Sequence, residues 1–314
     1  MSLPTDAVVE SLLEISAGDL HAVITPEAGG SIAGFFADHQ GARIDWLRPA
    51  SEEGLAARNP LAMASFPLVP WCNRIRDGRA SFEGRDIHCP PNHPAEDSPH
   101  PLHGIGWLRP WDVETVSHDE VRLALHVGAS PAWPWSFSAR QRYRITSTQL
   151  QVDIAITNDD SVAMPAGIGH HPYFPHAADA RITSACSAMW KGDAQAMPTG
   201  IEETEAVRKL RDGVELRELD LDNNFTGWQR RTLVEWPASN AGPERLLVME
   251  AQPPLDFFVL YCPHQYDFFC AEPVSQCTDW LNLAGRYGQK LVGGARVEPG
   301  QTLEARFTLT PRWR

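Results

Sequence analysis

The sequence predicts an all-β protein in which antiparallel sheets form a sandwich, with few short helices. Several segments alternate strictly between apolar and polar residues, which is the pattern of strands buried on one face. The 314 residues include 26 Pro and 23 Gly, which is typical of a chain with many turns. The strand patterns do not alternate with helical ones, which argues against a doubly wound α/β sheet.

The predicted elements follow in chain order. Residues 32–36 and 43–47 flank Asp38-His39-Gln40-Gly41 and predict a first hairpin. Residues 80–82 and 86–88 flank Glu83-Gly84-Arg85 and predict a second. A third joins residues 142–145 to residues 149–156 through Thr146-Ser147-Thr148. Single strands are predicted from the alternation over residues 121–126 and 302–309.

Two short helices are expected between these strands. Ser51 precedes Glu52 and Glu53, which suits the start of a helix over residues 51–57. A second is expected over residues 202–210, before Gly213. Residues 90–101 are rich in Pro, His and acidic residues and predict an exposed loop. Because no linker or repeat divides the chain, we expect residues 1–314 to form a single domain.

Composition limits the possible partners. The net charge of −13 argues against binding to nucleic acids and anionic membranes, which favour basic surfaces. The six Cys residues are scattered without a CxxC pair, which fits neither a disulfide scaffold nor a zinc knuckle. Residues 1–6 carry no signal-peptide pattern, and no segment has the pattern of a membrane span. We therefore expect a cytoplasmic protein, monomeric or homodimeric, that acts on a small molecule.

Three segments carry donor groups suited to a hydroxyl-rich ligand. Asn73 and Arg74 end an apolar stretch, and His103 precedes Gly104, where a ligand can approach the backbone closely. His170 and His171 are adjacent, so on a strand their side chains face opposite sides and only one points into a given pocket.

Two acidic residues complete the candidate site. Asp222 stands in a predicted loop, where its carboxylate can bind sugar hydroxyls or form a local turn. Glu272 follows a strongly apolar run, so burial is expected to raise its pKa toward the range of a general base. The chain has 11 Trp, and Trp71 and Trp107 lie next to these motifs, where we expect sugar contacts.

The same His and Glu residues could instead hold a metal ion. The donors of the right kind are His100, His103, either His170 or His171, and Glu272. However, the chain contains neither HxH nor HExxH, and the two His at positions 100 and 103 stand in a Pro-rich segment. We therefore predict no metal site.

Taken in order, these segments resemble the aldose 1-epimerases, or mutarotases, from about Ile32 to Thr310. The motifs that carry the resemblance are Asn73-Arg74-Ile75, Leu102-His103-Gly104, His171-Pro172-Tyr173-Phe174, Leu221-Asp222-Asn223-Asn224-Phe225, and Ala271-Glu272-Pro273 with Asn282 further on. The resemblance implies a β-supersandwich with an open cleft, no cofactor, and an isomerase that interconverts the α and β anomers of a free hexose.

The resemblance also implies a role for each matching position. Glu272 matches the general base, His171 the general acid at the ring oxygen, and His103 a second histidine near the reacting centre. Arg74 and Asp222 match residues that bind sugar hydroxyls.

Two alternatives remain open from the sequence. Arg74, Arg76 and Arg79 could form a basic cluster for an anionic hexose, such as a hexose 6-phosphate or a sulfosugar. A non-catalytic sugar-binding protein on the same scaffold would need the arginine and tryptophan contacts, but not both His171 and Glu272.

Overall fold

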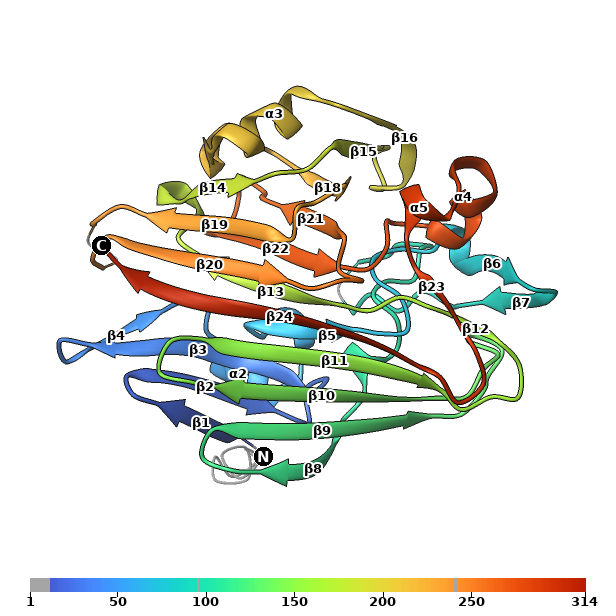
Figure 1. The fold of residues 1–314 in the computed structure, drawn as a ribbon, viewed down its shortest axis with the longest axis horizontal. Helices are drawn as coiled ribbons and strands as arrows, with labels where there is room; N and C mark the ends of the chain where they lie inside the picture. Colours follow the sequence, from blue (N-terminus) through green and yellow to red (C-terminus); the bar gives the residue numbers. More distant parts are fainter. Residues whose placement is uncertain (1–11, 95, 240–241) are drawn as a thin grey trace.

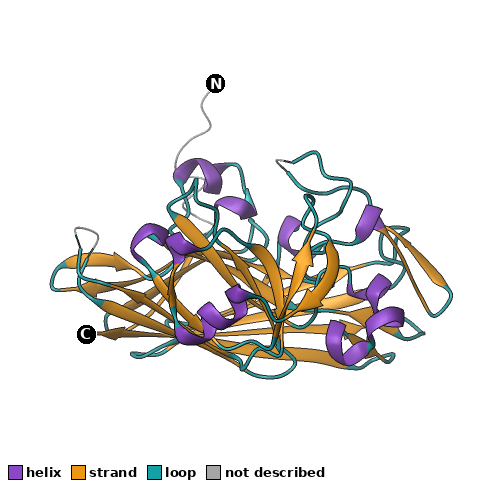
Figure 2. Ribbon diagram, turned by 90° about the horizontal axis from the view of Figure 1, so that it is seen from above, coloured by secondary structure: helices purple, strands orange, loops and turns teal. Residues whose placement is uncertain are grey.

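A computed structural model describes residues 12–94, 96–239 and 242–314, and its strands lie in two large stacked sheets (Figure 1). The segment in which we expected no signal peptide, residues 1–6, lies outside the described residues. Strands form the body of the molecule and the helices are short segments at its periphery (Figure 2). The all-β prediction is therefore confirmed.

The first sheet has eleven strands and carries the segments singled out in the sequence. Its order is β1 (Leu13–Ala17), β2 (Leu20–Thr25), β3 (Ser31–His39), β5 (Ser65–Leu68), β13 (Gly169–Pro175), β22 (Phe268–Val274), β21 (Phe257–Tyr261), β18 (Asp222–Thr226), β15 (Ala188–Gly192) and β16 (Pro198–Glu202), with β4 (Ala42–Asp45) beside β3. Its central strands β5, β13 and β22 are buried along their length or nearly so.

The second sheet has nine strands. Its order is β17 (Val214–Glu215), β14 (Arg181–Ser184), β19 (Arg231–Trp236), β20 (Arg245–Ala251), β24 (Thr302–Trp313), β11 (Leu150–Asn158), β10 (Phe137–Ile145), β9 (Glu120–Val127) and β8 (Asp112–Val116). Two small antiparallel pairs join β12 (Met164–Ala166) to β23 (Ala295–Val297) and β6 (Arg79–Phe82) to β7 (Arg85–His88).

The core lies between the large sheets because their facing strands turn alternate apolar residues inward. In β11 the residues Leu150, Val152, Ile154 and Ile156 are buried, and the residues between them are half-buried. They belong to one apolar cluster with residues of the first sheet such as Phe35. The alternation that predicted these strands thus reflects a sheet with one face in the core.

The three predicted hairpins are present as β3–β4, β6–β7 and β10–β11. Both predicted helices are present as α2 (Glu52–Ala56) and α3 (Glu205–Asp212), and the Ser51 hydroxyl accepts a hydrogen bond from the Gly54 amide at the start of α2. The sequence analysis missed α4 (Trp280–Tyr287) and α5 (Gln289–Val292). Neither has a side-chain cap at its first turn, so the usual start signal is missing. Short 3-10 turns occupy Pro60–Ala62, Arg76–Gly78, Gly106–Leu108, Ala177–Asp179 and Leu216–Glu218.

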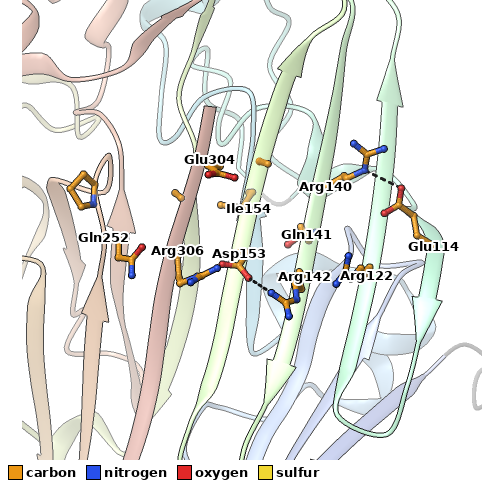
Figure 3. A pocket seen from close by; sticks show the side chains of 13 residues that line it. Glu114, Arg122, Arg140, Gln141, Arg142, Asp153, Ile154, Gln252, Glu304 and Arg306 are labelled. Atoms are coloured by element: carbon orange, nitrogen blue, oxygen red, sulfur yellow. Dashed lines mark hydrogen bonds and ion pairs between the residues drawn. The ribbon is translucent and has the colours of Figure 1, made fainter. Parts of the chain in front are cut away.

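The outer face of the second sheet forms a shallow charged depression of about 590 Å³ (Figure 3). Asp153 accepts a hydrogen bond from Arg306 and forms an ion pair with Arg142. Arg140 Nε lies 3.0 Å from Glu114 Oε1. These charges neutralise one another within the sheet face. The depression therefore has the character of a stabilising ion-pair network.

Each of the six cysteines is a buried free thiol. Among the described residues, no helix is both long and apolar enough to cross a lipid bilayer.

Candidate active site

The predicted polar motifs meet at a cavity of about 280 Å³ on the first sheet. The volume is at the small end of the range for ligand pockets. Its walls are Leu61, Asn73, Arg74, His93, Glu96, Leu102, His103, His171, Tyr173, Asp222, Tyr261, Tyr266, Phe268 and Glu272. All six predicted polar site residues are therefore brought together here, although they are spread over 200 positions of the chain.

The two adjacent histidines of β13 face opposite sides of the sheet, as the alternation predicted. His171 lines the cavity. His170 is fully buried on the core side, where its Nδ1 hydrogen-bonds to the Ser65 hydroxyl and its Nε2 lies 3.2 Å from Gln141 Oε1. Gln141 belongs to β10, so this buried polar cluster joins the two large sheets.

The pairing of β5 with β13 fixes both histidines. His171 lies opposite Phe66 in the register, and their rings stack with centroids 4.5 Å apart. On the other face, the hydrogen bond between Ser65 and His170 joins the same two strands. Both faces of the strand pair therefore oppose a shift of β13.

Glu272 of β22 lies directly against His171. The distance from His171 Nε2 to Glu272 Oε1 is 3.1 Å. Only 2% of Glu272 and 7% of His171 is exposed, so both groups meet the substrate space from the bottom of the cavity. The second carboxylate oxygen, Oε2, is buried and has no hydrogen-bond partner among the described residues. That oxygen therefore has lone pairs left for a hydrogen bond from a ligand.

Burial shifts the pKa values of this pair in opposite directions. Burial raises the pKa of Glu272 well above its usual value, the Asp222 charge adds to this, and Arg74 opposes it. Burial lowers the pKa of His171 to about 3, and Arg48 and Arg74 contribute to the same direction. The site therefore favours a protonated Glu272 beside a neutral His171. Transfer of that proton from Glu272 to His171 gives a carboxylate and an imidazolium with no change in net charge.

His103 reaches the same space from the loop before the 3-10 turn Gly106–Leu108. Its ring centroid lies 5.0 Å from that of His171, with the two rings nearly perpendicular. The Asn73 amide donates to His103 Nδ1 at 3.1 Å, so the neutral ring must carry its proton on Nε2. Burial and the nearby His171 hold the pKa of His103 well below its usual value. The ring is thus a fixed hydrogen-bond donor at neutral pH.

Arg74 and Asp222 form a polar wall of the cavity. Arg74 Nη1 lies 3.7 Å from Asp222 Oδ2 and 3.4 Å from Asn73 Oδ1. Asp222 does not stand in a loop, as we expected, but is the first residue of β18. The strand buries Asn224, Phe225 and Thr226 and pairs with β21 in the first sheet.

Two expectations about aromatic residues are corrected. Trp71 is 2% exposed and packs in the main core, with its ring centroid 5.1 Å from that of Trp133. Trp107 is fully buried behind Phe66 and His103, and neither tryptophan lines the cavity. Their large apolar area is better buried than exposed to a ligand.

The cluster of three arginines that the sequence left open as an alternative does not form at the cavity. Arg76 lies 3.6 Å from Asp279 and 3.8 Å from Asp193, and Arg79 is exposed on β6. Arg74 alone of the three lines the cavity. Carboxylates from distant parts of the chain thus pair with Arg76 and, through Asp222, with Arg74.

The sequence analysis missed several cavity residues. His93 and Glu96 come from the segment that we predicted to be an exposed loop, and they form one wall. Tyr261, Tyr266 and Phe268 form an aromatic rim, in which the rings of Tyr266 and Phe268 stack at 5.0 Å. The aromatic content of residues 266–269 was visible in the sequence, but it is equally typical of a buried strand.

Histidine and carboxylate side chains such as those at the cavity are also the usual donors of a metal site. Within residues 12–94, 96–239 and 242–314, no group of three or more His, Cys, Asp or Glu side chains is arranged to hold a metal ion.

Comparison with known proteins agrees with the fold and the motifs. The sequence model of the family described as aldose 1-epimerase matches residues 11–310, so the chain belongs to the aldose 1-epimerase family. The uncharacterised protein YphB of Escherichia coli (strain K12) is 28% identical over 311 residues, which cover 96% of this chain and 99% of YphB.

Solved structures show the same architecture. A candidate aldose 1-epimerase from Escherichia coli K12 superposes with a TM-score of 0.83 and 26% identity, covering 96% of this chain and 99% of the other. A galactose mutarotase-like protein from Clostridium acetobutylicum superposes with a TM-score of 0.82 and 19% identity, covering 96% and 95% of the two chains. At that identity the second likeness concerns the fold alone.

Proposed function

We propose that this protein is an aldose 1-epimerase that interconverts the α and β anomers of a free, uncharged hexose. The observation that carries the proposal is the buried contact between His171 and Glu272 in the lining of the cavity, where Oε2 of Glu272 has no hydrogen-bond partner among the described residues. Anomer exchange needs one group that takes a proton from the O1 hydroxyl and one that gives a proton to the ring oxygen. A carboxylate and an imidazole in contact can do both.

The reaction begins with the proton of the pair on His171. The Glu272 carboxylate takes the proton of the sugar O1 hydroxyl while His171 Nε2 gives its proton to the ring oxygen O5. The O5–C1 bond breaks, and C1 and O1 become the aldehyde. Rotation about C1–C2 and the reverse proton transfers close the ring on the other face. Ring opening leaves Glu272 protonated and His171 neutral, which are the forms that burial favours.

Other cavity residues hold the sugar in this mechanism. His103 donates its Nε2–H to a sugar oxygen near C1, because Asn73 keeps its Nδ1 as the acceptor. Arg74 and Asp222 supply a donor and an acceptor for hydroxyl groups. No group with redox chemistry is needed for these steps.

The charges of the cavity support an uncharged substrate. The lining contains the carboxyl groups of Glu96, Asp222 and Glu272 but a single arginine, Arg74. A phosphate or sulfonate placed there would lie close to carboxylates without a second guanidinium to balance it. The proposal therefore favours glucose- or galactose-type sugars over a hexose 6-phosphate or a sulfosugar.

The test is saturation-exchange NMR on freshly dissolved α-glucose, α-galactose and glucose 6-phosphate. We expect faster anomer exchange for at least one neutral sugar and at least tenfold weaker acceleration of the phosphate. Glu272→Gln keeps the shape of the side chain but removes the base, so exchange should slow by at least about 10²-fold. Glu250→Gln, an exposed position on β20, is the matched control and should keep the wild-type rate.

Two results would contradict the proposal. Near-normal exchange by Glu272→Gln would remove the mechanism. Binding of neutral sugars without any acceleration by the wild-type protein would indicate a non-catalytic carbohydrate-binding protein instead.

A further inference from the structure

Asn92 has no place in the mechanism above, but its side chain is fully engaged with the loop that carries His103. The Leu102 amide donates to Asn92 Oδ1 at 2.6 Å. In the other direction, Asn92 Nδ2 donates to the carbonyl oxygens of Leu102, at 2.8 Å, and Gly104, at 3.1 Å. One carboxamide thus binds the backbone on both sides of His103.

This loop has a conformation that needs support. His103 has a φ of +57° and Gly104 a φ of +78°, both in the left-handed region that non-glycine residues rarely adopt. A Cβ on Gly104 would lie 2.2 Å from the Val69 carbonyl oxygen, so the backbone of this loop is also in close contact with the segment that contains Val69. Such a conformation persists only where surrounding contacts hold it.

The position of the His103 ring depends on the same backbone. The His103 amide donates to the Asn73 carbonyl at 2.9 Å, and the Asn73 amide donates to His103 Nδ1 at 3.1 Å. Trp107 Nε1 also donates to the carbonyl oxygens of Leu102 and Gly104. Asn73 and Trp107 therefore hold the loop from two sides, and Asn92 adds the contacts to the Leu102 amide and to both carbonyls.

We propose that Asn92 is a positioning residue for the epimerase reaction, because it holds the loop 102–104 where His103 Nε2–H meets the sugar. This inference rests on the proposed function. It also predicts that Asp cannot replace Asn at position 92 without loss of activity. A carboxylate can accept from the Leu102 amide, but it cannot donate to the two carbonyl oxygens and would repel them.

A double-mutant cycle tests the proposal. Asn92→Asp should lower kcat by about 10- to 100-fold with a smaller change in KM, since a displacement of about 1 Å in a reacting group costs up to about 10²-fold. In a His103→Gln background the same substitution should cost less than about threefold, because the group that Asn92 positions is already gone. An equal cost in both backgrounds would overturn the proposal.

A matched control separates positioning from general stability. Asn158 makes the same kind of contacts far from the cavity: its Nδ2 donates to the carbonyls of Val162 and Val297, and its Oδ1 accepts from the Asp160 amide. Asn158→Asp should lower the melting temperature but leave kcat of the folded protein unchanged. A fall in kcat equal to that of Asn92→Asp would contradict a role specific to His103.

A measurement without substrate keeps this inference distinct from the proposed function. Nitrogen-15 NMR of the His103 ring should show protonation on Nε2 in the wild-type protein and a loss of that single tautomer in Asn92→Asp. An unchanged His103 spectrum would overturn the positioning role even if the protein is active. Absence of anomer exchange in a wild-type protein with the expected spectral change would instead refute the proposed function.

Discussion

The buried His170 makes the stability of the protein sensitive to acid in a way that can be calculated. Burial, with a contribution from His171, lowers the pKa of His170 from 6.5 to about 3. Between these two values the unfolded chain binds a proton at this position and the folded chain does not. The free energy of unfolding therefore falls as the pH falls from 6.5 toward 3.

The size of the effect follows from the shift. The full slope is about 1.4 kcal/mol per pH unit, but the unfolded histidine is only half protonated at pH 6.5, so His170 should contribute a loss of about 2 kcal/mol between pH 6.5 and pH 4.5. Glu272 acts in the opposite direction, because its raised pKa means that the folded chain binds the proton first. The total pH dependence is thus a sum, and a variant is needed to isolate the His170 part.

The substitution His170→Asn provides that comparison, because it removes the titrating ring and leaves a polar group facing Ser65. Urea unfolding at pH 6.5, 5.5 and 4.5 gives the free energy of unfolding of each protein. The variant should be less stable than the wild type at pH 6.5, and this gap should shrink by about 2 kcal/mol at pH 4.5. His118→Asn, at the exposed turn before β9, is the control and should follow the wild type. A gap that stays constant within about 1 kcal/mol would refute the reasoning.

Two further substitutions test features of the fold. Gly104→Ala places a Cβ 2.2 Å from the Val69 carbonyl oxygen at a φ of +78°. It should therefore lower the melting temperature by several degrees in thermal unfolding and slow anomer exchange in saturation-exchange NMR. A fully active, equally stable variant would contradict the described loop. Asp153→Asn removes the carboxylate shared by Arg306 and Arg142 on the outer sheet face. It should lower the free energy of unfolding, measured with urea at low salt, by about 1 kcal/mol and leave the rate of anomer exchange unchanged. A change in that rate would show that this face is coupled to the cavity.

Much of the fold could be predicted from the sequence because it rests on local patterns. The alternation over residues 149–157 and 302–309 directly reflects strands with one face in the core. The turn Glu83-Gly84 and the Ser51 cap act within a few residues, so they too are visible in the sequence. Helix α4 starts from Asp279 in a left-handed conformation without a side-chain cap, and this depends on contacts far along the chain.

The site residues that belong to sequence motifs could be predicted. Those that reach the cavity only through contacts between distant segments could not. His171 and Glu272 meet because β13 and β22 pair in the register that places these two positions opposite each other. Nothing within the segment 90–101 indicated that His93 and Glu96 would line the cavity, because the position of this segment depends on hydrogen bonds to other parts of the chain, such as the one from the Asp77 amide to His100. The alternative in which Arg76 and Arg79 join Arg74 at an anionic ligand is not supported, because neither lines the cavity and Arg76 pairs with two distant carboxylates that its position in the sequence does not reveal.

The alternation of β13 has a consequence for how the chain can change in length. Ser65 and Phe66 of β5 bind His170 and His171 on opposite faces of the same strand pair. A shift of β13 by one residue toward its C-terminus, against β5 and β22, would turn His171 into the core and bring His170 to the cavity beside Glu272. A shift by two residues would return His171 to the cavity face but move it about 7 Å along the strand, away from Glu272. The site therefore fixes the register of β13 and not merely the face that each histidine occupies, so length changes before Gly169 are tolerated only where the preceding connection absorbs them.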